Sequence, residues 1–177
     1  MALSAELIDR IGHIKLAIFD VDGVLTDGSL HYGANGEELK VFNALDGHGL
    51  KLLQDAGVAL AIISGRESKA LERRAKDLRV SQLFMGVENK LNMFETLLKS
   101  LSLVPAQSAG IGDDVIDLPF LTRCGFAACV PSAPAYVKQR VHYVTTAQGG
   151  HGAVREFCDL IMQAQGTWDA VLKKYLD

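Results

Sequence analysis

Short apolar segments alternate with segments of helical periodicity along the chain, and this alternation restricts the possible folds more than any other feature. The apolar segments, each bounded by turn residues, are 14–19, 58–63, 82–85, 108–111, 126–130 and 143–145. Between them, apolar residues recur at three- and four-residue spacing in 49–56, 67–78, 90–101, 115–124 and 135–140. Strands that are apolar throughout are buried on both faces, as in a parallel sheet covered by helices. We therefore predict an α/β fold with a doubly wound, Rossmann-like and mainly parallel sheet.

One segment interrupts the alternation. Two short strand-like stretches, 29–32 and 39–42, flank a polar turn, which predicts a β-hairpin insertion at about 29–42. The insertion is too small to be a cap domain with its own core, so its apolar residues need the body or another subunit to pack on. We expect a single domain, 1–177, without a cap and with a C-terminal tail over about 149–177 that has a glycine-rich start.

Composition excludes several classes of protein. With 49% hydrophobic and 22% charged residues, the chain is expected to be globular, and its net charge of −3 without a basic tract argues against nucleic-acid binding. No apolar stretch approaches the length of a membrane span, and the start lacks the pattern of a secretory signal. Three cysteines, Cys124, Cys129 and Cys158, lie in apolar surroundings and are expected to be buried free thiols. We expect a cytoplasmic protein.

Carboxylates follow two of the predicted strands. Asp20 and Asp22 come directly after 14–19, and Asp113, Asp114 and Asp117 follow 108–111, where open α/β sheets bind ligands. An isolated pair of this kind is more often an acidic turn, and a single acid after a strand is often an N-cap. However, two carboxylates ~4 Å apart repel each other by roughly 4 kcal/mol, so a cation should complete the site. A cluster of oxygen ligands suits Mg²⁺.

Two further polar groups stand at element ends. Ser64, Gly65 and Arg66 lie between the strand 58–63 and the helix 67–78, where a helix N-terminus offers N–H groups to a phosphate. Lys90 begins the helix 90–101. Taken alone, the first group is an ordinary turn and the second a solvated charge.

The joint order of these clusters resembles the four motifs of the haloacid dehalogenase superfamily of phosphohydrolases. At closer range the chain is similar to the family of 3-deoxy-D-manno-octulosonate 8-phosphate phosphatases, which lack a cap domain. The resemblance covers essentially the whole chain. It is carried by residues 20–28, 42–43, 46–47, 49–51, 64–67, Lys90, 112–114 with 116–117, and 152–156.

The resemblance implies a catalytic role for each cluster. Asp20 would be the nucleophile that forms an aspartyl phosphate, and Asp22 the general acid and base. Ser64 would donate to a phosphate oxygen, and Lys90 would offset the negative charge. Mg²⁺ would be held by Asp20, the main-chain carbonyl of Asp22, and Asp113. Supporting residues would be Gly65, Asp114 and Asp117.

The resemblance also implies a substrate and an assembly. The substrate would be a sugar-acid phosphate used in lipopolysaccharide precursor synthesis. Its contacts would be Asp22, Asn43, Ala44, Leu45, Asp46, Gly47, Lys51, Arg66, Arg74 and Lys90. The family forms homotetramers in which the hairpins pack together and the tail reaches a neighbour's active site, and His151 stands where a basic residue is common.

Other functions stay open. The phosphate of a related nine-carbon sugar acid would present the same two anionic ends. A phospho-acceptor receiver domain also combines carboxylates, a hydroxyl and a lysine, but it has adjacent acids after its first strand and a separate acceptor after a later strand. A catalytically idle assembly module is the third alternative, because related domains occur fused to sugar-nucleotide synthases.

Overall fold

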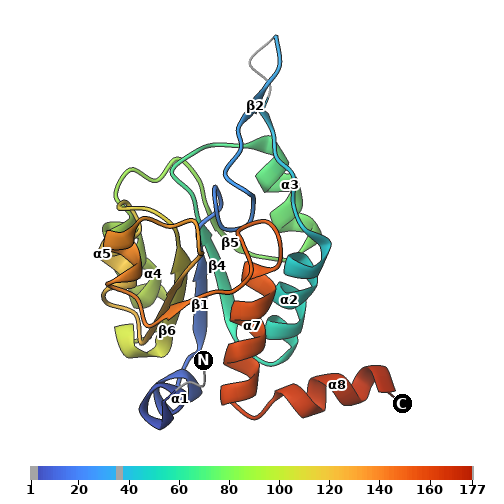
Figure 1. Ribbon diagram of the computed structural model, residues 1–177, viewed down its shortest axis with the longest axis vertical. Coiled ribbons are helices and arrows are strands. Elements are labelled where there is room, and N and C mark those ends of the chain that lie inside the picture. The colour runs from blue at the N-terminus through green and yellow to red at the C-terminus, as the bar shows by residue number, and fades with distance from the viewer. Residues whose placement is uncertain (1–3, 35–37, 177) are drawn as a thin grey trace.

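The main sheet has six parallel strands in the order β5-β4-β1-β6-β7-β8, which confirms the predicted fold class. The computed structural model describes residues 4–34 and 38–176. The chain starts at the centre of the sheet, adds two strands on one side, and then returns to add three on the other (Figure 1). The topological switch point of this doubly wound sheet lies between β1 and β6. The strands are β1 Leu16–Phe19, β4 Ala59–Ile63, β5 Gln82–Phe84, β6 Ser108–Gly112, β7 Phe126–Cys129 and β8 Tyr143–Val144.

Helices cover both faces of the sheet, with α4 and α5 on one side and α2 and α7 on the other (Figure 1). The sequence patterns located most of them but did not predict α1 or α8. The helices are α1 Ala5–Gly12, α2 Ala44–Asp55, α3 Lys69–Asp77, α4 Lys90–Leu101, α5 Leu118–Leu121, α6 Ala135–Lys138, α7 Ala153–Ala164 and α8 Trp168–Leu176, with a 3₁₀ turn at Pro105–Gln107.

Capping side chains account for the helix starts that differ from the predictions. α2 begins at Ala44 instead of residue 49, because the Asn43 side chain accepts hydrogen bonds from two backbone N–H groups of its first turn. α3 begins at Lys69 instead of residue 67, because Ser68 is its N-cap. α4 spans the predicted residues, with Asn89 as the cap. α5 is a single turn, much shorter than the predicted 115–124.

The core lies between the sheet and its helices. Phe157 of α7 packs on β1 and β7, with its ring centroid 5.7 Å from that of Phe19 and 5.4 Å from that of Phe126. The three cysteines are free and buried, as predicted. No helix among the described residues is long and apolar enough to span a membrane.

The predicted hairpin is present and projects beyond the carboxyl ends of the main strands (Figure 1). Its strands are β2 His31–Tyr32 and β3 Glu38–Leu39, and part of the predicted turn, 35–37, lies outside the described residues. The apolar residues of this segment do not pack on the body: Tyr32, Leu39 and Val41 are 61–63% exposed. The unburied apolar side that the sequence predicted is therefore available to another molecule.

The glycine-rich start of the tail packs on the loop after β1 of its own chain. The Gly150 N–H donates to the Val24 carbonyl over 2.9 Å. A Cβ atom at Gly149 would lie 1.7 Å from the Gly23 carbonyl oxygen, so only glycine allows this approach. These contacts fix the start of the tail on its own chain. Beyond them, α7 and α8 lead to the opposite end of the molecule from the hairpin (Figure 1).

Candidate active site

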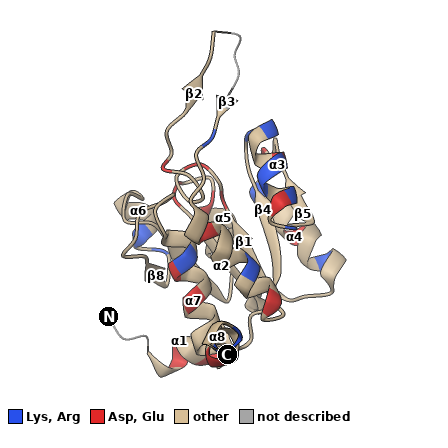
Figure 2. Ribbon diagram, turned by 90° about the vertical axis from the view of Figure 1, so that its right-hand side faces the viewer, with Lys and Arg blue, Asp and Glu red and all other residues tan. Residues whose placement is uncertain are grey.

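The polar clusters singled out in the sequence meet at the carboxyl edge of the sheet. Asp20 follows β1, Ser64 follows β4, and Asp113 follows β6, so the site straddles the switch point. Acidic segments gather here, at the base of the hairpin (Figure 2). Parallel strands bring their ends to one edge, which explains why residues far apart in the sequence form one site.

Lys90 is the buried cation of the site. Its Nζ donates to Asp20 Oδ1 over 2.5 Å and to Asp117 Oδ1 over 2.6 Å. The residue is 3% exposed, which rules out the solvated lysine that the sequence left as an alternative. Burial lowers the pKa of Lys90, but the Asp20 and Asp117 carboxylates outweigh it and leave that pKa above its usual value. Lys90 therefore stays charged between two buried acids.

Asp117 orders the loop after β6. It is fully buried, and its Oδ2 accepts hydrogen bonds from the N–H groups of Asp113 (3.0 Å) and Asp114 (3.2 Å). A Cβ atom at Gly112 would lie 2.6 Å from the Asp117 Cβ, so the glycine makes room for this side chain. With both oxygens engaged, Asp117 fixes the positions of Lys90 and Asp113.

The carboxylates of the site carry more negative charge than Lys90 balances. Burial raises the pKa of Asp20 to about 8, with Asp117 acting in the same direction and Lys90 opposing it. Burial, followed by the Asp117 and Asp114 charges, raises the pKa of Asp113 to about 6. Both carboxyl groups would ionise more readily beside an additional cation.

The donor set fits a hard divalent ion such as Mg²⁺. Carboxylate oxygens of Asp20, Asp113 and Asp117 all lie within 4.8 Å of one another. Because the Asp117 oxygens are already engaged, Asp20 and Asp113 are the better candidates as ligands. A Cβ atom at Gly23 would lie 2.2 Å from Asp113 Oδ2, so the glycine makes space for that carboxylate. All the available ligand atoms are oxygens, as Mg²⁺ prefers.

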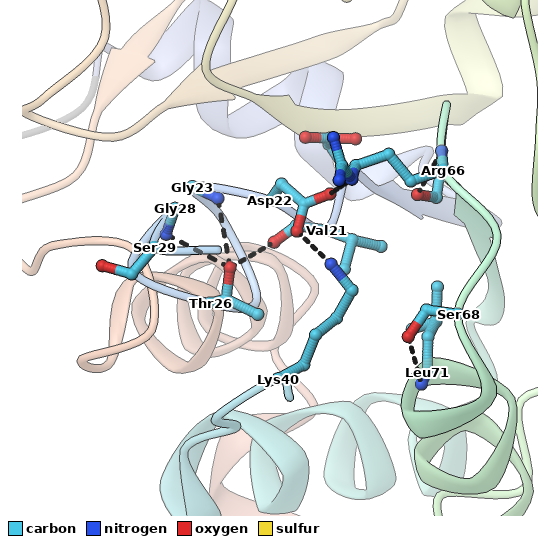
Figure 3. A network of polar contacts seen from close by, with 12 residues as sticks. Val21, Asp22, Gly23, Thr26, Gly28, Ser29, Lys40, Arg66, Ser68 and Leu71 are labelled. Atoms are coloured by element: carbon cyan, nitrogen blue, oxygen red, sulfur yellow. Dashed lines mark hydrogen bonds and ion pairs between the residues drawn. The ribbon is translucent and has the colours of Figure 1, made fainter. Parts of the chain in front are cut away.

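Asp22 belongs to a separate charge network at the mouth of the site (Figure 3). Lys40 Nζ donates to its Oδ1, and Arg66 Nε lies 3.9 Å from its Oδ2. The loop that carries Asp22 is closed by Thr26, whose Oγ1 accepts hydrogen bonds from the N–H groups of Gly23 (3.3 Å) and Gly28 (3.2 Å). The Asp22 side chain is 23% exposed, so it lies within reach of a ligand.

Ser64 is buried at the end of β4, and its Oγ accepts a hydrogen bond from the Arg66 N–H over 3.2 Å. The helix after Ser64 starts later than the predicted residue 67, because α3 begins at Lys69 with Ser68 as its N-cap. The polar groups beside Ser64 belong instead to the turn that contains Gly65, which is exposed.

The residues predicted to contact substrate divide into two groups. Arg74, on α3, reaches the start of α2, where its Nη2 donates to the Asn43 carbonyl over 3.0 Å and its guanidinium adjoins Gly47. Asp46 is buried and turns toward α7, accepting hydrogen bonds from the N–H groups of Gly152 (3.2 Å) and Arg155 (2.8 Å). The remaining predicted contacts on α2, together with His151, are exposed: Ala44, Leu45 and Lys51.

Comparison with known proteins agrees with this geometry. Residues 86–157 match the family model of haloacid dehalogenase-like hydrolases. The chain is 47% identical to 3-deoxy-D-manno-octulosonate 8-phosphate phosphatase KdsC of Haemophilus influenzae over 157 residues, which cover 89% of this chain and 87% of that protein. This chain belongs to the KdsC family.

Solved structures of KdsC family members have the same fold. The phosphatase of Moraxella catarrhalis, solved in complex with magnesium, phosphate and KDO, gives a TM-score of 0.94 at 41% identity, covering 96% of this chain and 98% of that one. The cobalt-bound form of the Haemophilus influenzae phosphatase gives a TM-score of 0.90 at 44% identity, covering 95% of this chain and 99% of that one.

Within this KdsC family chain, the sequence reasoning missed Lys40. The hairpin was expected to need another surface for its apolar residues, and within this chain Leu39 and Val41 are exposed while Lys40 between them is 7% exposed. Alternating residues of an extended segment point to opposite sides, so a lysine between two apolar residues must face away from them. That alternation was the available signal, but it became informative only once the apolar side was known to face outward.

Proposed function

We propose that the protein is a Mg²⁺-dependent phosphomonoesterase that hydrolyses 3-deoxy-D-manno-octulosonate 8-phosphate to the free sugar acid and phosphate. The observation that carries the proposal is the buried Lys90 bridging Asp20 and Asp117 beside Asp113, at the switch point of the sheet. Family membership supports the reaction class, and the similarity to the 3-deoxy-D-manno-octulosonate 8-phosphate phosphatase of Haemophilus influenzae supports the substrate.

Asp20 is the nucleophile in this proposal. Lys90 holds its Oδ1, so the second oxygen faces phosphorus and forms the aspartyl phosphate as the bond to the sugar oxygen breaks. Asp22 gives a proton to the departing alkoxide and then takes one from the water that cleaves the intermediate. The Ser64 hydroxyl donates a hydrogen bond to a phosphate oxygen.

Asp20 and Asp113, with the Asp22 main-chain carbonyl, hold the metal, and Asp114 and Asp117 support them. When bound, Mg²⁺ supplies positive charge that draws the phosphate toward the acids and stabilises the transferring group. The chain's own part is to keep these carboxylates converged, which the Lys90 ammonium and the Asp117 contacts do.

The sugar end needs partners for a carboxylate and hydroxyl groups. Arg66, whose side chain is 40% exposed beside Asp22, and Arg74 supply guanidinium groups suited to a carboxylate. Asn43 to Gly47 and Lys51 complete the proposed substrate set. Asp46 serves there through its main chain, because its side chain is engaged with α7.

A cytoplasmic location, a role in lipopolysaccharide precursor synthesis and a single-domain homotetramer are parts of the same proposal. The exposed apolar residues of the hairpin support the assembly. The catalytically idle module is the weaker alternative, because the acids and the lysine are all in place. A receiver domain is weaker too, because Asp20 and Asp22 are not adjacent.

The test is phosphate release from a panel of eight- and nine-carbon sugar-acid phosphates, with and without Mg²⁺. We expect Mg²⁺-dependent turnover with the largest kcat/KM on the eight-carbon 8-phosphate. A larger kcat/KM on a nine-carbon substrate would transfer the assignment to that compound. No turnover on any substrate would contradict the proposed function, and a stable phosphoprotein without turnover would favour the receiver domain.

A further inference from the structure

A cation lies near each oxygen of the Asp22 carboxylate, Lys40 at one and Arg66 at the other (Figure 3). Lys40, which follows β3, donates to Oδ1. On the other side, Arg66 Nε lies 3.9 Å from Oδ2, and Arg66 Nη2 donates to the hydroxyl of Tyr32 in β2. The Arg66 guanidinium also lies 6.0 Å from the centre of the Tyr32 ring. Asp22 is thus held between two cations that the hairpin positions.

The burial of Lys40 indicates what it does. Only 1% of its side chain is exposed, and its ammonium group donates to the Asp22 carboxylate. Removing an ammonium group from water costs several kcal/mol unless it is paired. The ion pair with Asp22 offsets that loss, and it also joins the base of the hairpin to the loop after β1.

Positioning matters most for a group that transfers a proton. Asp22 lies on a loop and is partly exposed, so its carboxylate has freedom that the buried Asp20 lacks. A general acid works only when its proton lies within hydrogen-bond reach of the leaving oxygen. The Lys40 hydrogen bond to Oδ1 restricts that freedom and leaves Oδ2, 3.9 Å from Arg66 Nε, as the oxygen that carries the proton.

We propose that Lys40 is a positioning residue for Asp22, and that the hairpin orients this general acid through Lys40 and the Tyr32–Arg66 pair. This inference rests on the proposed function. It makes the hairpin part of the catalytic apparatus as well as an exposed apolar surface. Displacing the hairpin changes kcat more than KM, because the group that it orients acts in the transition state.

The test is Lys40→Met, which keeps the apolar stem and removes the ammonium. Kinetics are measured on the best sugar-acid phosphate and on p-nitrophenyl phosphate, whose leaving group needs little protonation. We expect kcat on the sugar-acid phosphate to fall about tenfold to a hundredfold, and kcat on the aryl phosphate to fall less than about threefold. Lys76→Met, an exposed lysine on α3, is the matched control and should leave both rates unchanged.

A double-mutant cycle with Asp22→Asn separates positioning from a general structural role. If Lys40 acts through Asp22, Lys40→Met adds little to the loss that Asp22→Asn already causes. Additive losses, or equal losses on both substrates, would overturn the proposal. If Lys40→Met fails to fold by circular dichroism, Tyr32→Phe on the exposed hairpin replaces it. We then expect about a threefold loss confined to the sugar-acid phosphate, and no loss would overturn the proposal.

Failure of this inference is distinguishable from failure of the proposed function. A wild-type protein that is inactive on every sugar-acid phosphate overturns the proposed function. If the wild-type protein is active but Lys40→Met loses equal activity on the sugar-acid phosphate and on the aryl phosphate, only the proposed role of Lys40 is overturned.

Discussion

The two charge clusters of the site are built differently. The Lys90 cluster is deeply buried: Asp20, Lys90 and Asp117 are 6%, 3% and 0% exposed, and they come from elements of the main sheet and its helices. The Asp22 cluster lies at the mouth, with the side chains of Asp22 and Arg66 23% and 40% exposed, and it depends on the hairpin. The core holds fixed charges in place, whereas an accessory segment orients a group that has to transfer a proton.

The largest effect in the comparison of the two clusters is expected from changing the nucleophile. Asp20→Asn should abolish turnover, with a loss of at least about a thousandfold. The melting temperature of the metal-free variant should stay the same or rise, because one of three converging acids loses its charge. Phosphate release and thermal unfolding measure the two effects, with the exposed Asp55→Asn as a control. Retained turnover would remove Asp20 from the mechanism.

A smaller effect on turnover, and a larger one on stability, is expected from removing the buried cation. Lys90→Met leaves Asp20 and Asp117 without their partner and should reduce the free energy of unfolding by about 3–5 kcal/mol. Lys40→Met should reduce it less, because Asp22 is partly exposed to water. Urea denaturation of both variants without metal checks the order. The reverse order would mean that the hairpin, and not the core, holds the site together.

Metal and pH should act mainly on the buried cluster. The folded-state pKa values of Asp20 (about 8) and Asp113 (about 6) lie above those of an unfolded chain. Stability from these groups is therefore complete below their ordinary pKa of 3.8 and is lost as the pH rises from there to about 6 for Asp113 and about 8 for Asp20. Mg²⁺ should oppose this loss and add about 2.7 kcal/mol at a hundred times its Kd. Thermal unfolding from pH 5 to 9, with Mg²⁺ or with a chelator, measures both effects, and Asp113→Asn should abolish the gain from Mg²⁺.

The smallest expected effect concerns the loop that carries Asp22. Thr26→Val removes the acceptor of two N–H groups and should cost about 1–3 kcal/mol of stability. We expect a smaller loss of kcat than in Lys40→Met, because the Lys40 contact to Asp22 remains. Steady-state kinetics of the two variants decide this. An equal or larger loss in Thr26→Val would show that the turn of the loop, and not the hairpin, orients Asp22.

Much of the site was predictable because strand ends are local features. Asp20, Ser64 and Asp113 each follow an apolar strand, and Lys90 begins a helix that spans its predicted residues. The length of α5 and the starts of α2 and α3 were harder to predict from the sequence. Those starts depend on single capping side chains, which compete with nearby residues of similar chemistry.

The sequence by itself determined the order of strands and helices and the polar residues at their ends, because hydrophobic periodicity acts over a few residues. Only the tertiary structure decided which charges meet. Lys90 pairs with Asp20 at a separation of 70 residues, and Asp46 caps α7 across 106 residues. Nothing local distinguishes these partners from other acids and lysines. Their pairing follows from where the sheet places each loop, and from the cost of leaving a buried charge unpaired.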